Sequence, residues 1–357
     1  MQLLLARCVT SIIGTGNGYS TVVEPVRALT QIAFLLERAG ESTYKVQAFR
    51  RAAAVAARLP DEELRRHVEQ GTLTRLPGIG RSIAAVITET ARDGESGYLT
   101  GLLERGGPPV QGGARLRAAL RGDCHTHSDW SDGGSPIRQM AETARELGHE
   151  WVALTDHSPR LRIANGLSAD RLRRQLEVVA GLNEEFAPFR VLTGIEVDIL
   201  ADGGLDQDEG LLAELDVVVA SVHSGLRAPK REMTRRMVAA VSNPHVDVLG
   251  HCTGRIVAGK GRPESTFDAE AVFAACRDNG VAVEINSRPD RLDPPMRLLD
   301  LAVDLGCLFA IDSDAHAPGQ LDWQLYGCDR AERCGIRQED VVNTRPADQL
   351  FSSLTAR

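Results

Sequence analysis

Six histidines and three carboxylates stand out because each closes, or closely follows, a short apolar run over a stretch of almost 200 positions. Together they exceed the four ligands of a single zinc ion, and carboxylates can bridge two ions. One such histidine alone would be interpreted as a hydrogen-bonded core residue; the ordered series predicts two or three divalent ions (zinc, manganese or iron) and hydrolytic chemistry. The residues are His125, His127, Asp132, His157, Glu196, His223, His251, Asp314 and His316.

The local spacing of these residues supports a shared site. His125 and His127 alternate with Thr126, so in an extended segment both imidazoles lie on one face and can bind one ion. Asp156 precedes His157 directly and has two interpretations. It either orients a neighbouring imidazole through a hydrogen bond or caps its own loop.

The elements that must position these residues alternate between strands and helices after residue 120. Helical patterns at Ile137–Leu147, Ala169–Phe186, Arg231–Val241, Asp268–Asn279 and Met296–Leu305 separate the strands. We therefore expect an α/β fold, a distorted seven-stranded (β/α)7 barrel with its functional residues at the carboxyl ends of the strands. The predicted strands are Arg121–Cys124, Trp151–Thr155, Arg190–Val197, Asp216–Val222, Val246–Gly250, Val281–Asn286 and Leu308–Asp312.

The first third of the chain has a different, all-helical pattern. Helices are expected at Glu24–Gly40, Lys45–Leu59 and Asp61–Gln70, followed by the turn Leu76-Pro-Gly-Ile-Gly and a further helix. A glycine- and proline-rich stretch after Arg105 reads as a linker. The expected organisation is an N-terminal extension at 1–23, a small helical domain at 24–105, a linker at 106–118 and a catalytic domain at 119–357.

Composition sets broad limits. The 357 residues are 43% hydrophobic, enough for one large and one small core, and no apolar run is long enough to cross a membrane. Seven cysteines without paired spacing favour reduced thiols and a cytoplasmic location. The net charge of −8 is uneven, because residues 1–110 carry 13 Lys and Arg against 11 Asp and Glu. The overall charge therefore does not exclude a nucleic-acid partner.

Residues 119–357 resemble the PHP (polymerase and histidinol phosphatase) domain, in particular the version found in bacterial family X DNA polymerases. Three of the segments that carry the resemblance are Gly122-Asp-Cys-His-Thr-His-Ser-Asp-Trp-Ser-Asp-Gly, Ala153-Leu-Thr-Asp-His-Ser and Asn286-Ser-Arg-Pro-Asp-Arg-Leu. The resemblance implies three metal ions. The first would be held by His125, His127, Glu196 and Asp314; Glu196 would bridge to a second with His223 and His251; Asp132, His157 and His316 would hold the third.

Such a site would hydrolyse phosphoesters with a metal-bound hydroxide as the nucleophile, because paired ions lower the pKa of a shared water. The loops after the strand ends are also rich in Arg and Lys, which suggests an anionic substrate. Surface arginines are common in loops, so solvation is the alternative role for each. Arg255 and Arg288 are nearest to strand ends and are the predicted phosphate-binding residues.

The small domain resembles the N-terminal helix-hairpin-helix domain of polymerase beta and its bacterial relatives. The resemblance implies DNA binding by Lys45, Arg50 and Arg51, together with backbone N–H groups of a turn at Gly78, Gly80 and Arg81. Val86 occupies the position of that domain's Schiff-base lysine, so abasic-site lyase chemistry is not expected. The alternative is a helical bundle whose turn is only a turn.

Three functions remain in competition. The first is a metal-dependent hydrolase of phosphoester bonds that acts on DNA 3' ends in repair, as a 3'-5' exonuclease, with a separate polymerase or ligase as a further partner. It would lack polymerase activity, because only a short linker separates Leu103 from Gly122. The second is a small-molecule phosphatase of the histidinol-phosphatase type. The third is a catalytically silent DNA-binding module, which the complete ligand series opposes.

Overall fold

The computed structural model describes residues 23–106 and 110–351, and the chain divides into two compact units that part between residues 109 and 110. The extension predicted at 1–23 lies outside the described residues except for Val23, as do residues 107–109 of the predicted linker. No helix within the described ranges is long and apolar enough to span a bilayer.

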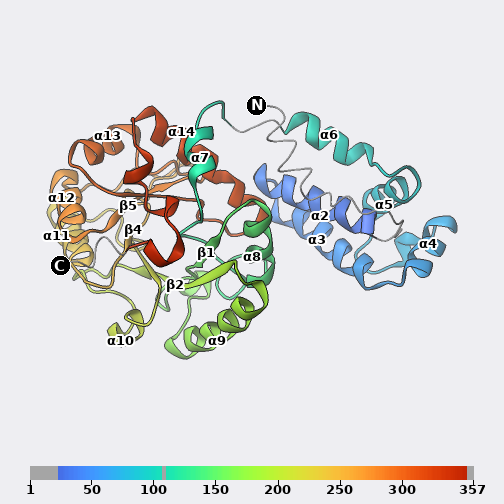
Figure 1. Ribbon diagram of the computed structural model, residues 1–357, viewed down its shortest axis with the longest axis horizontal. Helices are drawn as coiled ribbons and strands as arrows, with labels where there is room; N and C mark the ends of the chain where they lie inside the picture. Colours follow the sequence, from blue (N-terminus) through green and yellow to red (C-terminus); the bar gives the residue numbers. More distant parts are fainter. Residues whose placement is uncertain (1–22, 107–109, 352–357) are drawn as a thin grey trace. The chain divides into compact units, whose positions relative to one another are not determined.

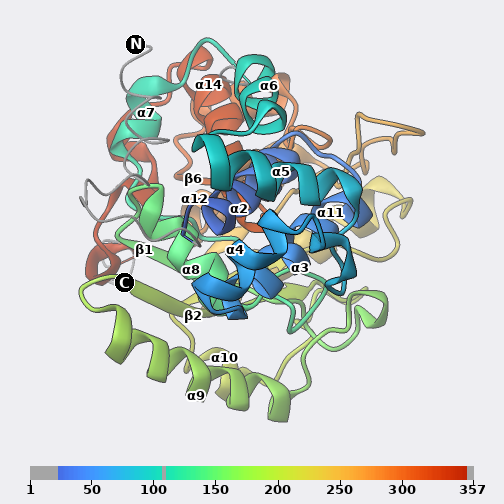
Figure 2. The same ribbon diagram turned by 90° about the vertical axis from the view of Figure 1, so that its right-hand side faces the viewer.

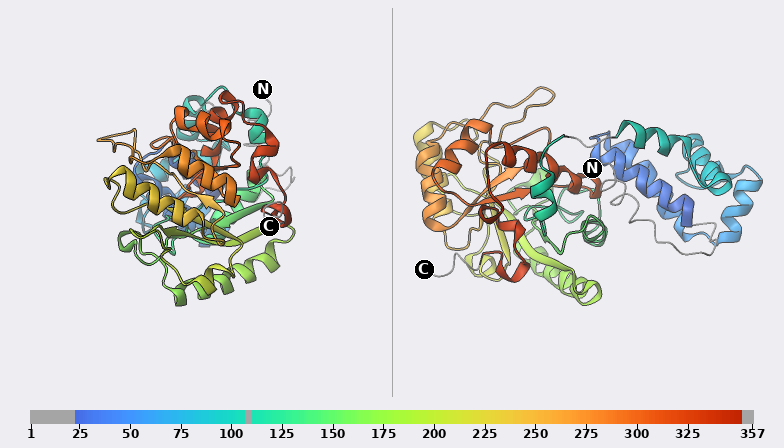
Figure 3. Two further views of the ribbon diagram at one scale, coloured as in Figure 1. Left: turned by 90° about the vertical axis from the view of Figure 1, so that its left-hand side faces the viewer. Right: turned by 45° about the horizontal axis from the view of Figure 1, so that its top comes forward.

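The N-terminal unit is all helical. It contains α2 (Val23–Arg38), α3 (Thr43–Arg58), α4 (Asp61–Glu69), the 3-10 turn η1 (Leu73–Arg75), α5 (Arg81–Asp93) and α6 (Gly97–Arg105). Figure 3 shows these helices as a bundle of their own. Its core is a single cluster that includes Leu29, Ile32, Phe49 and Ile87, each at most 4% exposed. The apolar spacing of the sequence therefore produces the bundle by burying one stripe of each helix.

The turn before α5 has the geometry of a hairpin between helices. Gly78 has a φ of +77°, a region that favours glycine, and Gly80 is the N-cap residue of α5. Ile79 between them is only 4% exposed and anchors the turn in the core. The backbone N–H groups at the start of α5 are consequently presented at the surface by a fixed turn.

The C-terminal unit is built on a six-stranded, wholly parallel sheet with the strands in sequence order. The strands are β1 (Trp151–Leu154), β2 (Arg190–Asp198), β3 (Val217–Ser221), β4 (Val248–Leu249), β5 (Ala282–Asn286) and β6 (Phe309–Asp312). The first of the seven expected strands is not formed as such. Instead, Thr126 makes isolated parallel bridges to Leu154 and to Ala315, so its segment links the two edges of the sheet.

Helices cover the outside of this sheet. Figure 1 shows α11, α12 and α13 along one flank, and α9 runs beneath β2 in Figure 2. Small and β-branched side chains such as Ala153, Val219 and Ala310 fill the inner face, while Ile195, Val218 and Ile285 pack against the helices. The helices are α7 (Ala114–Ala119), α8 (Ile137–Glu146), α9 (Ala169–Phe186), α10 (Glu209–Leu212), α11 (Lys230–Val241), α12 (Ala269–Asn279), α13 (Met296–Asp304) and α14 (Gln324–Arg333). Short 3-10 turns complete the unit: η2 (Arg162–Ala164), η3 (Pro318–Trp323), η4 (Gln338–Asp340), η5 (Val342–Thr344) and η6 (Ala347–Gln349).

A buried histidine away from the strand ends makes the stability of this unit pH-dependent. His149 is 4% exposed, and burial together with the charge of Arg117 lowers its pKa to about 3. The unfolded chain takes up a proton below pH about 6.5 whereas the folded chain does not, so stability is lost as the pH falls. We expect the difference in unfolding free energy between His149→Leu and wild type to shift by about 2 kcal/mol in favour of the variant when the pH falls from 8 to 5.

Urea denaturation of both proteins at pH 8, 6 and 5 measures this difference. Subtracting wild type from variant at each pH cancels the protonation of the other histidines. A difference that stays constant from pH 8 to pH 5 would contradict the depressed pKa of His149.

Candidate metal centre

Glu196, near the carboxyl end of β2, is the centre of the histidine series. Its carboxylate oxygens lie 2.7 Å from Nδ1 of His157, 2.9 Å from Nε2 of His251, 3.2 Å from Nε2 of His223 and 3.4 Å from Nε2 of His125. His157, His223 and His251 follow β1, β3 and β4, whereas His125 lies in the segment that links the two edges of the sheet. Glu196 itself is 1% exposed. The prediction that the series converges at one end of the sheet agrees with this geometry.

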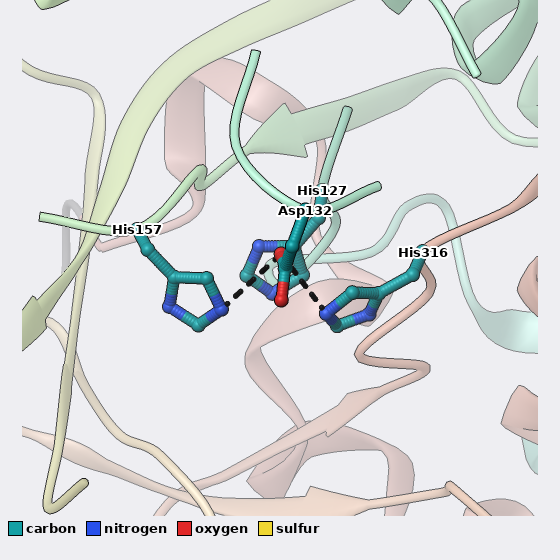
Figure 4. A group of neighbouring side chains, drawn as sticks. All are labelled: His127, Asp132, His157 and His316. Atoms are coloured by element: carbon teal, nitrogen blue, oxygen red, sulfur yellow. Dashed lines mark ion pairs between the residues drawn. The ribbon is translucent and has the colours of Figure 1, made fainter. Parts of the chain in front are cut away.

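A second group forms around Asp132, in the loop after the edge-linking segment. Figure 4 shows His157 and His316 on either side of Asp132, with His127 behind it. Oδ1 of Asp132 is 3.5 Å from Nε2 of His157 and 3.4 Å from Nε2 of His316. The rings of His127 and His316 have centroids 4.1 Å apart.

Within the described residues, three sets of side chains have ligand atoms close enough together to hold an ion. Each of His127, His157 and Glu196 belongs to two of these sets. The assignment of ligands to ions that the resemblance implies is different, because there only Glu196 is shared between two ions. His251 and Asp314 belong to none of the three sets, although each contacts a member: His251 touches Glu196, and Asp314 is 3.4 Å from His127. The sets are His127, Asp132, His157 and His316; His125, His127 and Glu196; and His157, Glu196 and His223.

The unpaired ring nitrogens of the histidine series are better explained by metal coordination than by hydrogen bonds within the cluster. Nε2 of His125, both ring nitrogens of His127 and of His223, and Nδ1 of His251 are buried without a hydrogen-bond partner in the described structure. Leaving a buried polar atom unpaired costs about 1–3 kcal/mol. Several such atoms aimed at neighbouring carboxylates are therefore better explained as ligands for divalent ions.

The charges of the cluster support the same conclusion. Burial would raise the pKa of Glu196, but the surrounding imidazoles, His223 and His157 first, hold it well below its ordinary value. Burial and then the charges of His316 and His157 hold the pKa of His127 well below its usual range, so that ring stays neutral. Burial would lower the pKa values of His125, His157 and His223, but the charge of Glu196 raises them, so this buried carboxylate draws positive charge toward itself. A divalent cation would supply that charge in place of these protons.

Glu284, in the middle of β5, supports this centre and was missed from the sequence. Its Oε1 lies 2.6 Å from Nδ1 of His125, and its other oxygen accepts a hydrogen bond from the backbone N–H of His251. Bonding Nδ1 of His125 leaves Nε2 free to face Glu196. A charged residue inside the apolar run Ala282–Asn286 was the signal that could have revealed it.

Local backbone geometry places two further members. Gly250, before His251, approaches β3 so closely that a Cβ atom there would lie 2.2 Å from Oγ of Ser221. Asp314 has a φ of +51°, a strained conformation for a non-glycine residue. Asn286 donates to Oδ2 of Asp314 at 3.0 Å, which fixes this carboxylate.

Asp156 caps a loop and does not orient an imidazole. It accepts hydrogen bonds from the backbone N–H of Ser128 at 2.8 Å, from the hydroxyl of Ser131 at 2.5 Å and from the amide of Gln175 at 2.6 Å. Its carboxylate therefore shapes the loop that carries Asp132.

The two arginines predicted to bind phosphate differ in the structure. Arg255 is not among the residues that line the cavity beside the cluster, because its guanidinium donates to the backbone carbonyls of Arg291 and Leu292 and braces that loop. Arg288 lines this cavity, which has a volume of about 360 Å³, and lies 3.8 Å from Asp314. Its guanidinium also lies over the ring of Trp323, 5.9 Å from the centroid, which holds it in position.

Arg291 is a better candidate than Arg255. It lines the same cavity, its Nε is 3.3 Å from Oδ2 of Asp314, and its Nη1 is buried with no hydrogen-bond partner among the described atoms. A guanidinium with an unused donor beside a metal cluster is suited to a phosphoryl oxygen. Position in the sequence could not distinguish it from the other loop arginines.

The residues of the N-terminal unit that were predicted to contact DNA also differ in their exposure and in their partners. Arg50 is engaged within the unit, because its Nε and Nη2 bind the carboxylate of Glu37 at 2.9 and 2.6 Å, and both side chains are nearly buried. Arg51, Gly78, Gly80 and Arg81 are exposed, while Lys45 is half-buried and paired with Glu41 at 3.1 Å. Val86 is 2% exposed in the core, so no amine stands there.

Comparison with known families agrees with this architecture. A PHP domain model matches residues 123–288, and a helix-hairpin-helix domain model matches residues 22–96. The chain belongs to the PHP family and carries a helix-hairpin-helix domain at its N-terminal side.

Two relatives differ in how much of their length is shared. The DNA polymerase/3'-5' exonuclease PolX of Bacillus subtilis is 40% identical over 63% of this chain, but the chain spans only 39% of that protein. A probable phosphatase of Thermoanaerobacter sp. is 30% identical over 62% of this chain and 89% of its own length. The structure of histidinol phosphate phosphatase from Lactococcus lactis is similar at 20% identity over 61% of this chain and 95% of its own, with a TM-score of 0.46.

Proposed function

We propose that this chain is a metal-dependent phosphoesterase that hydrolyses phosphoester bonds at DNA 3' ends, without polymerase activity. The observation that carries the proposal is the buried His and carboxylate cluster with unpaired ring nitrogens, next to a cavity lined by Arg288 and Arg291. Bound divalent ions would supply Lewis acidity and activate water for attack at phosphorus. Imidazole and carboxylate ligands suit zinc, manganese or iron.

Each part of the chain has a task in this proposal. Arg288 and Arg291 orient the phosphoryl group and offset its charge through donors that are already fixed in place. Asp314 holds both guanidinium groups at the edge of the cluster, within 3.8 and 3.3 Å. The helix-hairpin-helix turn holds the DNA backbone through exposed N–H groups and Arg81.

A small-molecule phosphatase is the second candidate. Two observations favour it: the cavity has a volume of about 360 Å³, which suits a small phosphomonoester, and the relative matched over 89% of its length is described as a probable phosphatase. A domain with a DNA-binding turn has no evident use in such an enzyme.

One substrate panel separates the two. Chelator-treated protein, reloaded separately with zinc, manganese or iron(II), is offered a 5'-labelled primer-template and a set of phosphomonoesters. Shortening of the primer from its 3' end is the expected result. Turnover of the monoesters alone would reject the DNA substrate, and inactivity with every metal would favour a DNA-binding module.

The DNA-binding role of the N-terminal unit predicts a salt effect. The triple change Lys45→Ala, Arg51→Ala and Arg81→Ala is expected to weaken DNA binding and to reduce the slope of log K against log salt by about 2, since each phosphate contact contributes roughly 0.9. Gel-shift titrations between 50 and 200 mM salt measure this. Arg65→Ala with Arg66→Ala, two exposed cations on α4, is the matched control. An unchanged slope in the triple variant would remove these residues from the interface.

A further inference from the structure

The cavity beside the histidine cluster has two chemically different parts to its lining. Arg288 and Arg291 supply two guanidinium groups beside the metal-ligand side chains in one part, while the loop between β1 and α9 contributes three apolar side chains. These apolar residues are Leu161, Ile163 and Ala164. A phosphate alone would use only the first part, so the second part needs an apolar group that is attached to the phosphate.

Ile163 is unusual for its exposure. It is 94% exposed, more than any other large hydrophobic residue in the described ranges. A single exposed isoleucine elsewhere on a surface is unremarkable. Here it lies at the cavity, where covering it with an apolar ligand surface would recover the free energy lost to its exposure.

The loop that carries Ile163 is braced, so this exposure is built in. The backbone N–H of Arg160 donates to Asp206 at 2.5 Å, and the side chain of Asn165 donates to the carbonyl of Trp130 at 3.1 Å. Arg171 donates to the carbonyl of Asn165 at 2.6 Å. Gly166 packs so tightly that a Cβ atom there would lie 1.8 Å from the carbonyl oxygen of Ser158. A braced loop presents its apolar side chain at little further cost in entropy.

Charge on the same loop indicates what the apolar group belongs to. Arg160 and Arg162 both precede Ile163 in the same loop, and both are exposed. Neither guanidinium has an ion pair within the described part of the chain. Two exposed cations next to an exposed apolar side chain match a nucleic-acid strand, in which phosphates alternate with flat bases.

We propose that Ile163, supported by Leu161, forms a subsite for the base of the nucleotide next to the scissile phosphoester, with Arg160 and Arg162 at the neighbouring backbone phosphates. This inference rests on the proposed function and adds a substrate class to it. The enzyme selects 3' ends that carry a base over 3' ends that have lost one.

The test uses two labelled oligonucleotides of identical sequence, one ending in an ordinary 3' nucleotide and the other in a tetrahydrofuran abasic residue. The full chain, loaded with the metal that gives activity, is expected to prefer the base-bearing end by roughly tenfold in kcat/KM, as contact with one aliphatic side chain allows. Ile163→Ser is expected to reduce this preference to about twofold or less, through KM. Ile163→Leu, which restores the apolar surface, should retain most of it.

Val257→Ser is the matched control, because Val257 is also an exposed apolar residue, at 53%, and does not line the cavity. Its preference ratio should equal that of wild type. A ratio is insensitive to partial unfolding, which lowers both rates equally. An unaltered ratio in Ile163→Ser, or no preference in wild type, would overturn the subsite. Wild-type inactivity on both oligonucleotides with turnover of monoesters would instead reject the proposed DNA substrate.

Discussion

Glu196→Gln is expected to lower kcat by roughly 10³-fold or more. The glutamine has the same shape but loses the charge that four imidazoles share within 3.4 Å. Loss of a metal ion that supplies several kcal/mol of transition-state stabilisation corresponds to three or more powers of ten. Single-turnover kinetics on the active substrate, together with elemental analysis of bound metal, measure the change.

The metal content identifies the cause of the loss. We expect Glu196→Gln to retain fewer ions than wild type after gel filtration, with its secondary structure by circular dichroism unchanged. Glu185→Gln removes an exposed carboxylate that forms an ion pair with Arg138, and should leave both kcat and metal content as in wild type. Full metal content and full activity in Glu196→Gln would refute the centre.

The clustering of the candidate ligands could be predicted because the carboxyl ends of all strands in a parallel sheet lie at the same rim. His157, His223 and His251 each follow a different strand, and parallel strands in sequence order bring their carboxyl ends to one rim. Alternation of apolar runs and helical patterns was therefore enough to bring these residues together. The apolar pattern fixed which face is buried and did not depend on loop structure.

The strand count was harder to predict for a physical reason. Residues 121–127 bend at Cys124 and form hydrogen bonds to both edges of the sheet, yet only Thr126 makes paired bridges. The cause lies in the side chains: Asp312 accepts from the N–H of Cys124, so a carboxylate takes the place of a ladder carbonyl. Sequence patterns predict where a chain is extended and do not show which acceptor each N–H will find.

Side-chain roles that depend on loop packing could not be predicted from the sequence. Arg50 looked like a phosphate ligand until Glu37, 13 positions away, proved to occupy its guanidinium. Arg255 looked equivalent to Arg288, but its donors are used by two carbonyls of the following loop. An arginine's function depends on which of its donors remain free, and that is a property of the folded chain.

Arg291→Ala is expected to lower kcat/KM by about 10- to 100-fold, because a hydrogen bond to a charged group contributes about 1.5–3 kcal/mol. The unpaired Nη1 of Arg291 is the donor that the substrate phosphate would use. Arg291→Lys keeps the charge without the planar fork and should recover only part of the loss. Inhibition by inorganic phosphate gives a second readout, since its inhibition constant should rise in the same order, from wild type through lysine to alanine.

Two measurements separate this role from an indirect effect through Asp314, which lies 3.3 Å from Nε of Arg291. Metal content should be close to that of wild type in Arg291→Lys if the arginine binds substrate, whereas a role in holding Asp314 would lower metal content and activity together. Arg297→Ala removes an exposed arginine whose partner is Glu264, and is expected to change neither quantity. Phosphate inhibition that is the same in wild type and Arg291→Ala would show that the guanidinium does not meet the substrate, and Arg288 would then be left as the phosphate-binding arginine of the cavity.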